Sequence, residues 1–416
     1  MSWTKPQKSN PLQFKVVTLG CRTNQYESQA FSDQLRQIGL TESSATAGAD
    51  ICVVNTCTVT ESADSSSRHA IRELLRENPH AKVMVTGCYA EAKPKEIASI
   101  DPRIQVISNK DKESLLQFAF PEEEIPEFKI THFEAHTRAF LKVQDGCNSF
   151  CTYCIIPYVR GRSRSRTRDE ILKEAEGLIA NGFKEIVVTG INVGDYDGGG
   201  GDTLAGLVRA LDALPGLERL RISSIDPDEV NDDLLDAVVS GRHTCPSMHI
   251  VLQAGSNAVL KRMNRKYTRQ IFLSTIDRLK KASPDFTFTT DIIVGFPGET
   301  EMDFEDTLAI MRDVQFAKVH MFPYSERKRT RAALFDGKLP PDIIKTRKSR
   351  LLNLAEEIAF DLRNHFLGRK MKVLVENNQQ GHTENFLPVI IPETLGKKND
   401  IIEVSLRENT PLGFIS

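Results

Sequence analysis

The sequence predicts an α/β protein in three parts: an N-terminal open parallel α/β sheet, a partial TIM-type (β/α)6 barrel and a small C-terminal β-barrel. In the first two parts, short apolar runs alternate with amphipathic stretches, as in chains that build parallel sheets covered by helices. The last part carries only short β-rich runs. The predicted domains are residues 13–125, 133–367 and 368–416.

Composition narrows the class of protein before any motif is considered. The chain has 416 residues, a net charge of −2 and eight cysteines. Because it is nearly neutral overall, contact with nucleic acid would have to come from local basic clusters. Residues 1–13 are polar, and no apolar run is long enough to cross a bilayer. We therefore expect a soluble, cytoplasmic protein without membrane partners, whose reduced cysteines bind metal or act in catalysis.

The first part contains three strand-like runs with helical patterns between them. The runs are 14–19, 51–55 and 82–86, and the helical patterns cover 25–39 and 68–76. The next segment, 121–138, is acidic at first and contains two prolines, so it is expected to be a linker.

The second part contains six strand-like runs, most of them separated by helical patterns. The runs are 140–143, 185–189, 219–223, 249–252, 286–294 and 318–322. The helical patterns are 169–180, 204–214, 228–239, 268–282 and 300–314. Six βα units favour an incomplete TIM-type barrel, although periodicity alone leaves an open doubly wound sheet as the alternative.

A long amphipathic pattern, 341–367, closes the second part and ends before Gly368, a residue suited to a helix C-cap. The β-rich runs of the third part are 371–376, 386–391 and 401–406. They predict a small barrel of the OB type.

The motif C-N-S-F-C-T-Y-C occupies residues 147–154 and has C-x3-C-x2-C spacing. Three thiolates this close together can hold one corner of a cubane iron–sulfur cluster. No fourth cysteine follows nearby, so one iron would stay open to an exogenous ligand. The motif also follows the first barrel strand, at the end where barrel active sites are built. The alternatives are three unrelated thiols or a zinc site, which would lack a nearby fourth ligand.

With an aromatic residue, Tyr153, before its last cysteine, the motif resembles the radical S-adenosylmethionine superfamily. The resemblance implies that the open iron binds the amino and carboxylate groups of S-adenosylmethionine. It also implies that reduction of the cluster breaks a carbon–sulfur bond and gives a deoxyadenosyl radical.

Cys21, Cys57 and Cys88 each follow one of the strand-like runs of the first part. In an open parallel sheet these strand ends line the ligand crevice, so the three thiols can meet despite their long spacing. The alternative is that they are buried small hydrophobic residues, which suits Cys52 inside an apolar run better. The sequence therefore favours a second iron–sulfur cluster on Cys21, Cys57 and Cys88.

The two sets of cysteines together resemble the methylthiotransferases over nearly the whole chain. Matching stretches include T-G-I-N-V-G-D-Y (189–196), D-I-I-V-G-F-P-G-E-T (291–300) and G-H-T-E-N-F (381–386). The family has an N-terminal domain with a three-cysteine cluster, a radical core and a C-terminal RNA-binding TRAM domain. The third part of this chain is short for a TRAM domain, which would weaken its hold on RNA.

The resemblance implies two 4Fe–4S clusters, one on Cys21, Cys57 and Cys88 and one on Cys147, Cys151 and Cys154. One S-adenosylmethionine methylates sulfur on the N-terminal cluster, and a second gives the radical that removes hydrogen from an unreactive carbon. A methylthio group is then inserted there. An acid–base pair could not activate such a carbon–hydrogen bond, so no catalytic residue beyond the clusters is expected.

Polar residues at the predicted strand ends could hold the sugar, amine or adenine of S-adenosylmethionine, and an aromatic ring could pack near the adenine. These candidates are Tyr153, Gly190, Asn192, Ser223, Ser224, Gln253 and Asp291. The alternative role for such residues is to terminate strands and cap helices.

Three basic clusters lie in or just beyond the predicted βα loops, where they favour contact with RNA phosphates over a merely solvated surface. In the first cluster, alternation would put all the arginines on one side of an extended segment. The residues expected to bind RNA are Arg160, Arg162, Arg164, Arg166, Lys261, Arg262 and Arg265. The third cluster includes Arg329, where relatives generally have glycine. If this position needs a positive φ, arginine adds strain there; otherwise the loop differs and the arginine binds RNA.

The stretch around Cys21, T-L-G-C-R-T-N-Q-Y-E-S, is most similar to the branch that modifies threonylcarbamoyladenosine in tRNA. The branch that modifies a ribosomal protein aspartate usually has Pro-Lys where this chain has Arg22-Thr23. Isopentenyl-adenosine in tRNA is the other alternative substrate. A rival of another class is a non-catalytic metal-binding RNA-binding protein. The expected partners are tRNA, a flavodoxin- or ferredoxin-like electron donor and a sulfur donor, and the sequence leaves the oligomeric state open.

Overall fold

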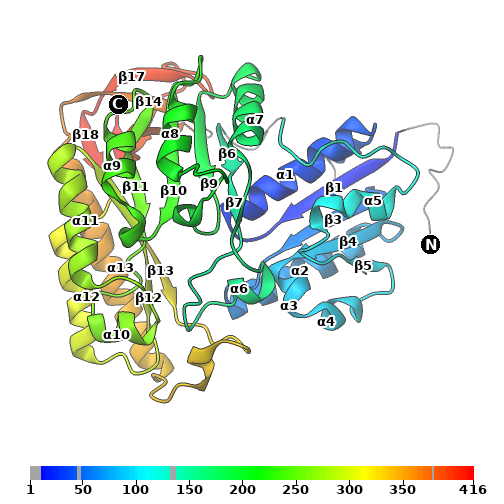
Figure 1. Ribbon diagram of the computed structural model, residues 1–416, viewed down its shortest axis with the longest axis horizontal. Helices are drawn as coiled ribbons and strands as arrows, with labels where there is room; N and C mark the ends of the chain where they lie inside the picture. Colours follow the sequence, from blue (N-terminus) through cyan, green and yellow to red (C-terminus); the bar gives the residue numbers. More distant parts are fainter. Residues whose placement is uncertain (1–10, 45–47, 132–136, 377–378) are drawn as a thin grey trace.

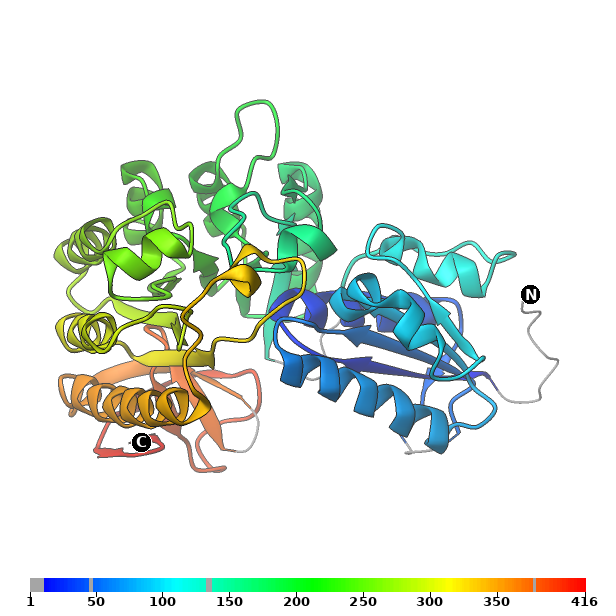
Figure 2. The ribbon, with the colours of Figure 1, turned by 90° about the horizontal axis from the view of Figure 1, so that it is seen from below.

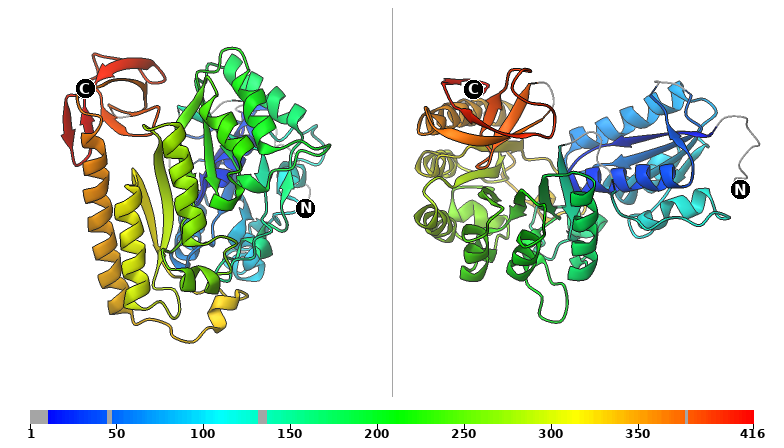
Figure 3. Two further views of the ribbon diagram at one scale, coloured as in Figure 1. Left: turned by 60° about the vertical axis from the view of Figure 1, so that its left-hand side comes forward. Right: turned by 90° about the horizontal axis from the view of Figure 1, so that it is seen from above.

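The computed structural model describes residues 11–44, 48–131, 137–376 and 379–416. The chain forms an N-terminal α/β body, a half barrel and a C-terminal β body (Figure 1). The N-terminal body, drawn blue and cyan, lies beside one edge of the half barrel. The red strands of the C-terminal body lie against one end of the barrel and follow its last helix (Figure 3).

The N-terminal body is a parallel five-stranded sheet whose middle strand is completely buried. Its strands, in spatial order, are β2 (Thr41–Glu42), β1 (Gln13–Thr18), β3 (Ile51–Thr56), β4 (Lys82–Gly87) and β5 (Ile104–Val106). Its helices are α1 (Arg22–Gln37), α2 (Glu61–Glu77), α3 (Cys88–Ala92), α4 (Pro94–Ala98) and α5 (Leu115–Ala119), with the 3-10 turn η1 (Lys112–Ser114) before the last. The three predicted strands are present, and the two missed strands are the short edge strands β2 and β5.

The half barrel has six parallel strands whose spatial order follows the sequence without a reversal. They are β6 (Arg138–Lys142), β9 (Glu185–Thr189), β10 (Arg219–Ile225), β11 (Thr244–Ile250), β12 (Thr287–Val294) and β13 (Lys318–Pro323). In a doubly wound sheet the order of the strands reverses at a switch point. The strand order here does not reverse, so the prediction of an incomplete barrel is correct. All six predicted strands are present, but β11 begins five residues earlier than predicted.

Helices cover the outer face of the half barrel and bury the largest apolar core of the molecule against it. They are α7 (Arg168–Ala180), α8 (Leu204–Asp212), α9 (Asp232–Val239), α11 (Arg269–Ala282), α12 (Glu301–Val314) and α13 (Pro341–Asn364). Threonine side chains cap the first turns of four of them, at Thr167, Thr203, Thr268 and Thr300. Among the described residues, no helix is both long and apolar enough to span a membrane.

Short elements lie in the loops that follow the barrel strands. They are β7 (Gln144–Asp145), α6 (Ile156–Val159), β8 (Arg164–Ser165), α10 (Asn257–Arg262) and the 3-10 turns η2 (Val193–Asp195), η3 (Pro227–Glu229) and η4 (Arg331–Leu334). The segment that carries η4 arches from the barrel toward the N-terminal body (Figure 2).

The C-terminal body is a six-stranded sheet in which all pairs are antiparallel except β16–β19. In spatial order its strands are β17 (Ile401–Ser405), β14 (Lys370–Val375), β15 (Gln380–Thr383), β16 (Pro388–Ile390), β19 (Gly413–Ile415) and β18 (Glu408–Thr410). The sequence predicted three β-rich runs here. The strands it missed, β15, β18 and β19, have only three or four residues each, too few for a clear alternation.

The end of β15 and the turn that follows it dock onto the amino-terminal ends of the barrel strands. Arg219 Nη1 donates to the carbonyl of His382 at 3.0 Å, and Arg221 Nη1 donates to that of Glu384 at 3.1 Å. The Phe386 ring lies 4.9 Å from Arg221 Cζ in a cation–π contact. The C-terminal body therefore covers the end of the barrel opposite to the strand ends that carry the cysteine motif.

Replacing Glu185 by glutamine should weaken this end of the barrel. Burial alone would raise the pKa of Glu185, but Arg221 and Arg138 outweigh burial and hold the pKa at about 2. Because this lies below the ordinary value of 4.5, the stabilisation is complete at neutral pH and is lost as the pH falls toward 2. We expect Glu185→Gln to lower the free energy of unfolding by about 3 kcal/mol at neutral pH, measured by urea titration and circular dichroism.

The difference between Glu185→Gln and the wild type should shrink between about pH 5 and about pH 3. The control is Glu218→Gln, which removes an exposed carboxylate 3.7 Å from Lys184 Nζ. It should change the free energy of unfolding by less than about 0.5 kcal/mol. Equal effects of the two variants would contradict the importance assigned to the buried carboxylate.

Candidate iron–sulfur sites and the cavity between the domains

Cys21, Cys57 and Cys88 lie at the carboxyl ends of three neighbouring strands of the N-terminal sheet. Cys57 directly follows β3, Cys88 directly follows β4, and Cys21 is the N-cap residue of α1. Gly20 lets the Cys21 loop pass close to Cys57, since a Cβ on Gly20 would lie 2.8 Å from the Cys57 Sγ. The structure thus brings together thiols that are more than thirty residues apart in sequence.

These three thiols influence one another electrostatically. Burial raises the pKa of Cys57 to about 12, and the neighbouring Cys88 and Cys21 contribute in the same direction. The pKa of Cys88 is raised by burial too, while the Arg160 guanidinium opposes that rise. Cys57 and Cys88 are buried and Cys21 is exposed. Three thiols with no hard ligands among them are a donor set for iron or zinc, which bind the deprotonated form.

The second set of thiols lies in the loop between β7 and α6. Cys147 Sγ accepts a hydrogen bond from the Ser149 amide at 3.4 Å, and Cys151 Sγ accepts one from Arg265 Nη1 at 2.9 Å. Burial raises the pKa of Cys154, and Cys151 and Cys147 raise it further. All three thiols therefore surround one small region at the mouth of the barrel.

Neither set of thiols has the geometry of a site for a single ion. Within the described ranges, no three His, Cys, Asp or Glu side chains converge as ligands of one metal ion. A cubane cluster binds each cysteine sulfur to a different iron, so its ligands need to surround a volume rather than converge on a point.

Arg160 connects the two halves of the site. Its side chain is fully buried, and its Nε donates to Cys88 Sγ at 3.3 Å. Its Nη1 donates to Glu27 in α1 at 3.0 Å and to Asp145 in β7 at 2.8 Å. Lys112 donates hydrogen bonds to the same two carboxylates from the N-terminal body. A buried ionic network therefore joins the N-terminal body to the barrel directly beside one of the thiols.

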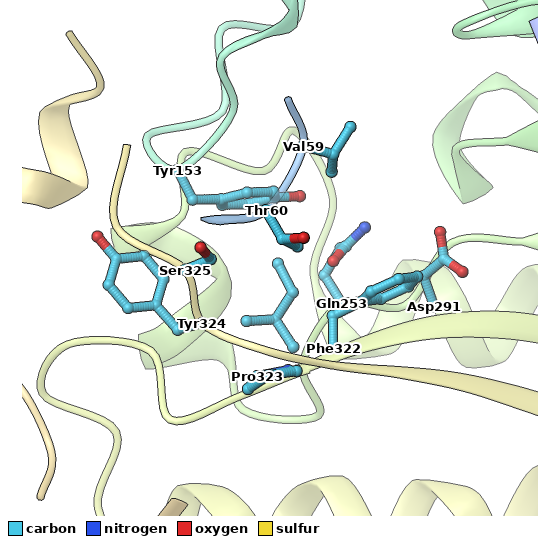
Figure 4. Close-up of a pocket in the computed structure, with 10 residues that line it drawn as sticks. Val59, Thr60, Tyr153, Gln253, Asp291, Phe322, Pro323, Tyr324 and Ser325 are labelled. Carbon is cyan, nitrogen blue, oxygen red and sulfur yellow. The ribbon is translucent and has the colours of Figure 1, made fainter. Parts of the chain in front are cut away.

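A cavity that is open to solvent lies between the N-terminal body and the mouth of the barrel (Figure 4). Ten residues line it: Val59, Thr60, Tyr153, Gln253, Asp291, Ile293, Phe322, Pro323, Tyr324 and Ser325. The first two come from the loop after Cys57, and the others come from the barrel. Among the described residues, Gln253 Oε1 and the Tyr324 hydroxyl are buried and have no hydrogen-bond partner. This is typical of a site in which a bound ligand supplies the missing partners.

Two contacts between the bodies hold this wall of the cavity in place. The Glu61 amide donates to Ser325 Oγ at 3.0 Å, and Arg327 Nη1 donates to Asp64 Oδ2 at 2.8 Å. Arg327 and Asp64 are both buried. The start of α2 is thereby fixed against the segment that follows β13.

The candidates for S-adenosylmethionine contacts separate into two groups. Tyr153, Gln253 and Asp291 line the cavity. The other four, at the ends of β9 and β10, are outside its lining: Gly190, Asn192, Ser223 and Ser224.

Two residues of the second group, Gly190 and Asn192, have roles within the protein itself. Gly190 lies close to Gln144, because a Cβ on it would be 2.9 Å from Gln144 Oε1. Asn192 Nδ2 donates to Glu229 Oε1 at 2.8 Å. Ser223 is different, because its hydroxyl is buried without a partner and stays available to a ligand.

The basic residues expected to contact RNA do not share one exposed face, which corrects the expectation from their alternation. Arg160 is buried, Arg166 is mostly buried against Glu174, and the Arg265 side chain is only 6% exposed beside Asp226. Partners from distant parts of the chain bind these guanidinium groups, so the three arginines are removed from the candidate RNA surface. Those that remain at the surface are Arg162, Arg164, Lys261 and Arg262.

Sequence reasoning missed the residues that join the bodies. Glu27 and Lys112 are ordinary charged residues of α1 and η1, and no local pattern marks them as buried. Val59 and Thr60 could have been found, because they directly follow Cys57 at the end of a strand. Arg22 could have been found in the same way, since it follows Cys21.

Two family profiles match the chain. The one described as "Radical SAM superfamily" covers residues 141–311, and the one described as "Uncharacterized protein family UPF0004" covers residues 13–109. The threonylcarbamoyladenosine tRNA methylthiotransferase MtaB of Chlamydia pneumoniae is 51% identical, with 91% of each chain covered. The chain belongs to the radical S-adenosylmethionine methylthiotransferase family.

Other members of this family are more distant. The MtaB protein of Bacillus subtilis is 36% identical over 94% of this chain and 92% of its own. The tRNA-2-methylthio-N(6)-dimethylallyladenosine synthase of Clostridium novyi is also 36% identical, over 87% of this chain and 85% of its own. Among solved structures, the radical S-adenosylmethionine methyltransferase TsrM of Kitasatospora setae, with cobalamin and a 4Fe–4S cluster bound, shares the fold. It has a TM-score of 0.55 at 14% identity, covering 75% of this chain and 74% of its own.

Adding a methyl group at Gly20 should displace the Cys57 side chain in this methylthiotransferase. Gly20 has a φ of +98°, and its new Cβ would overlap the Cβ and Sγ of Cys57. If strain and overlap together raise the free energy of the native conformation around Cys57 by about 1.4 kcal/mol, the population of conformations that expose the Cys57 thiol increases about tenfold. In metal-free Gly20→Ala protein, we expect iodoacetamide to alkylate Cys57 about tenfold faster, measured by mass spectrometry of its peptide.

Gly39→Ala is the matched control, because Gly39 also has a positive φ, +88°, but has nothing within 4 Å of the added Cβ. This variant should introduce backbone strain without overlap, and it should leave the rate of alkylation of Cys57 unchanged. If both variants accelerate alkylation equally, the close approach of Gly20 to Cys57 does not position this thiol.

Proposed function

We propose that this protein is a tRNA methylthiotransferase that adds a methylthio group to carbon 2 of threonylcarbamoyladenosine, next to the anticodon. The observation that carries the proposal is the pair of three-thiol sets, one at the strand ends of the N-terminal body and one in the loop after β7, which the Arg160 network joins. The proposed division of labour follows the domains: residues 13–125 bear the first cluster, 133–367 form the radical core, and 368–416 form a TRAM-like domain.

In this proposal Cys21, Cys57 and Cys88 hold one 4Fe–4S cluster, and Cys147, Cys151 and Cys154 hold another. Bound S-adenosylmethionine supplies the methyl group in one role and the radical in the other, so two molecules are used per product. The chain's own residues bind and orient these groups. Tyr153, Gln253 and Asp291 offer an aromatic face, an amide and a carboxylate to the cofactor in the cavity.

Two arginines support the clusters from outside. Arg160 donates to Cys88 Sγ at 3.3 Å, and Arg265 donates to Cys151 Sγ at 2.9 Å. Hydrogen bonds to ligand sulfurs stabilise the more negative state of a cluster and so raise its reduction potential. The second arginine is itself fixed by Asp226.

Two observations favour threonylcarbamoyladenosine over the other substrates. First, the 51% identical relative bears that name, whereas the dimethylallyladenosine synthase is 36% identical. Second, Arg22 of α1 lies over the Phe140 ring of β6, with its Cζ 5.8 Å from the ring centroid. In the part of the chain that the structure describes, the Arg22 side chain makes no hydrogen bond or ion pair.

An anionic substrate would compensate the charge on Arg22. Burial lowers the pKa of Arg22 only to about 10, so the guanidinium stays charged at neutral pH. The carboxylate of Asp291, which lines the cavity, is near enough to act in the opposite direction. The Arg22 side chain is half-buried, and a charge that is partly removed from water without a partner is costly. The threonylcarbamoyl group carries a carboxylate that can pair with Arg22, whereas an isopentenyl group carries no charge.

The other partners follow from the proposed chemistry. The radical step requires an electron, so a flavodoxin- or ferredoxin-like donor must reach the cluster on Cys147, Cys151 and Cys154. Each turnover removes sulfur, so a sulfur donor must restore it. The rival of another class, a non-catalytic metal-binding RNA-binding protein, needs neither partner.

Iron analysis separates the enzyme from this rival. Anaerobically reconstituted protein should contain about eight irons per chain, and Cys151→Ala and Cys57→Ala should each contain about four. Cys151→Ala should abolish deoxyadenosine formation, whereas Cys57→Ala should keep it and lose methylthio transfer. The control Cys245→Ala removes a buried thiol of β11 that belongs to neither set, and it should keep all its iron. One or two zinc ions in place of iron would contradict the proposal.

The substrate is tested in a bacterial strain that lacks its own enzyme of this type, by mass spectrometry of its tRNA nucleosides. The wild-type protein should restore 2-methylthio-threonylcarbamoyladenosine, and Arg22→Gln should restore about tenfold less, because the carboxylate loses its charged partner. Restoration of the isopentenyl product instead, or of neither, would contradict the substrate assignment.

Two controls show whether the effect of Arg22→Gln is specific. Arg36→Gln removes an arginine from the last turn of the same helix and should restore the product fully. Purified Arg22→Gln protein should still bind S-adenosylmethionine as the wild type does. Weaker cofactor binding in this variant would assign Arg22 to the carboxylate of S-adenosylmethionine.

A further inference from the structure

Four side chains form a continuous row beside the second set of thiols. Arg162 Cζ lies 4.3 Å from the centroid of the Phe150 ring, and this ring meets Tyr158 edge to face at 6.2 Å. The Tyr158 ring in turn faces Arg329 Cζ at 5.4 Å. We call these four residues the stacking row; in it, two aromatic rings lie between two planar cations.

Three side chains of the stacking row are exposed, and the fourth, Phe150, is half-buried. Tyr158 is 36% exposed, and Arg162 and Arg329 are exposed as well. Within the described segments, neither arginine makes a hydrogen bond or an ion pair. Exposed cation–π contacts are weak, so the row is a poor means of stabilising the fold.

The backbone under the stacking row is strained at two of its four positions. Phe150 has a φ of +47° and Arg329 has a φ of +82°, a region that favours glycine. The structure therefore resolves the question that the sequence raised about Arg329: its position does require a positive φ. Such strain persists where the surrounding structure holds it and where the side chain has a use.

We propose that the stacking row is the surface on which unpaired bases of the RNA loop stack when the target adenosine enters the barrel. This inference rests on the proposed function, because it takes tRNA as the substrate. Aromatic rings and guanidinium planes are the groups on which proteins stack single-stranded bases, and the unpaired arginines complement phosphate. Phe150 lies between Cys147 and Cys151, so a base held here adjoins the reacting adenosine.

The experiment measures the affinity of reconstituted full-length protein for a fluorescently labelled anticodon stem-loop RNA. Tyr158→Ala should weaken binding about tenfold, because a base loses its stacking surface, whereas Tyr158→Phe should bind within about twofold of the wild type. Arg329→Gly should weaken binding about fivefold and yet raise the melting temperature, because glycine relieves the strain. A purely structural role would move both properties in the same direction.

Two control variants match Arg329→Gly in one respect each. Gln315→Gly relieves a similar strain, at a φ of +57° after α12, and should raise the melting temperature without changing RNA affinity. Arg242→Ala removes an exposed arginine two residues before β11, at the opposite end of the barrel, and should leave affinity within about twofold.

The outcomes also separate this inference from the proposed function. If the wild type binds the stem-loop and both Tyr158→Ala and Arg329→Gly bind equally well, the stacking row is not an RNA surface. If the wild type binds the stem-loop no better than an unrelated hairpin, the proposed tRNA substrate fails, and the stacking row fails with it.

Discussion

The position of the N-terminal body depends on buried polar contacts with the barrel, and the central one is the ionic network in which Arg160 contacts Glu27, Asp145 and Cys88. Lys112 closes the network by donating hydrogen bonds to both carboxylates. Burial alone would raise the pKa of Glu27, but Arg160 and Lys112 outweigh it and hold the pKa at about 2. Removing one member of such a network typically costs 3–5 kcal/mol, because another charge is left buried and unpaired. The two bodies therefore do not separate readily, and the cavity that both of them line keeps its shape.

The same network sets the charge around the N-terminal thiols. Lys142 is also buried; it lies 3.7 Å from Glu27 and 3.3 Å from Glu113, so three buried cations face three carboxylates. The cation nearest the thiols is Arg160, whose Nε donates to Cys88 Sγ. A negatively charged, thiolate-bound cluster at Cys88 would place its charge beside this guanidinium. The polar interface is thus matched to an anionic group at the strand ends.

Local sequence patterns predicted the barrel strands and the positions of the N-terminal cysteines. Alternating strand and helix signals gave all six barrel strands, and the rule that parallel strand ends meet brought Cys21, Cys57 and Cys88 together. The start of β11 was missed because Pro246 and polar neighbours interrupt its apolar run. Arg160 was misplaced for a different reason. Its partner Glu27 is 133 residues away, and nothing in an alternating arginine pattern reveals which member is buried by such a contact.

The mouth of the barrel combines strain with unsatisfied polar atoms, and Gln253 shows both at one residue. Its φ is +62°, and it is held there because its amide donates to the carbonyl of Asp291 at 2.8 Å and its carbonyl accepts from the Ile293 amide at 2.9 Å. These contacts turn the chain into the cavity and leave the Gln253 Oε1 buried without a donor. Strain of this kind costs roughly 1–3 kcal/mol, a large share of the 5–15 kcal/mol by which a domain is stable. A ligand that donates to Gln253 Oε1 would offset part of that cost, so this corner of the cavity is built for an occupied state.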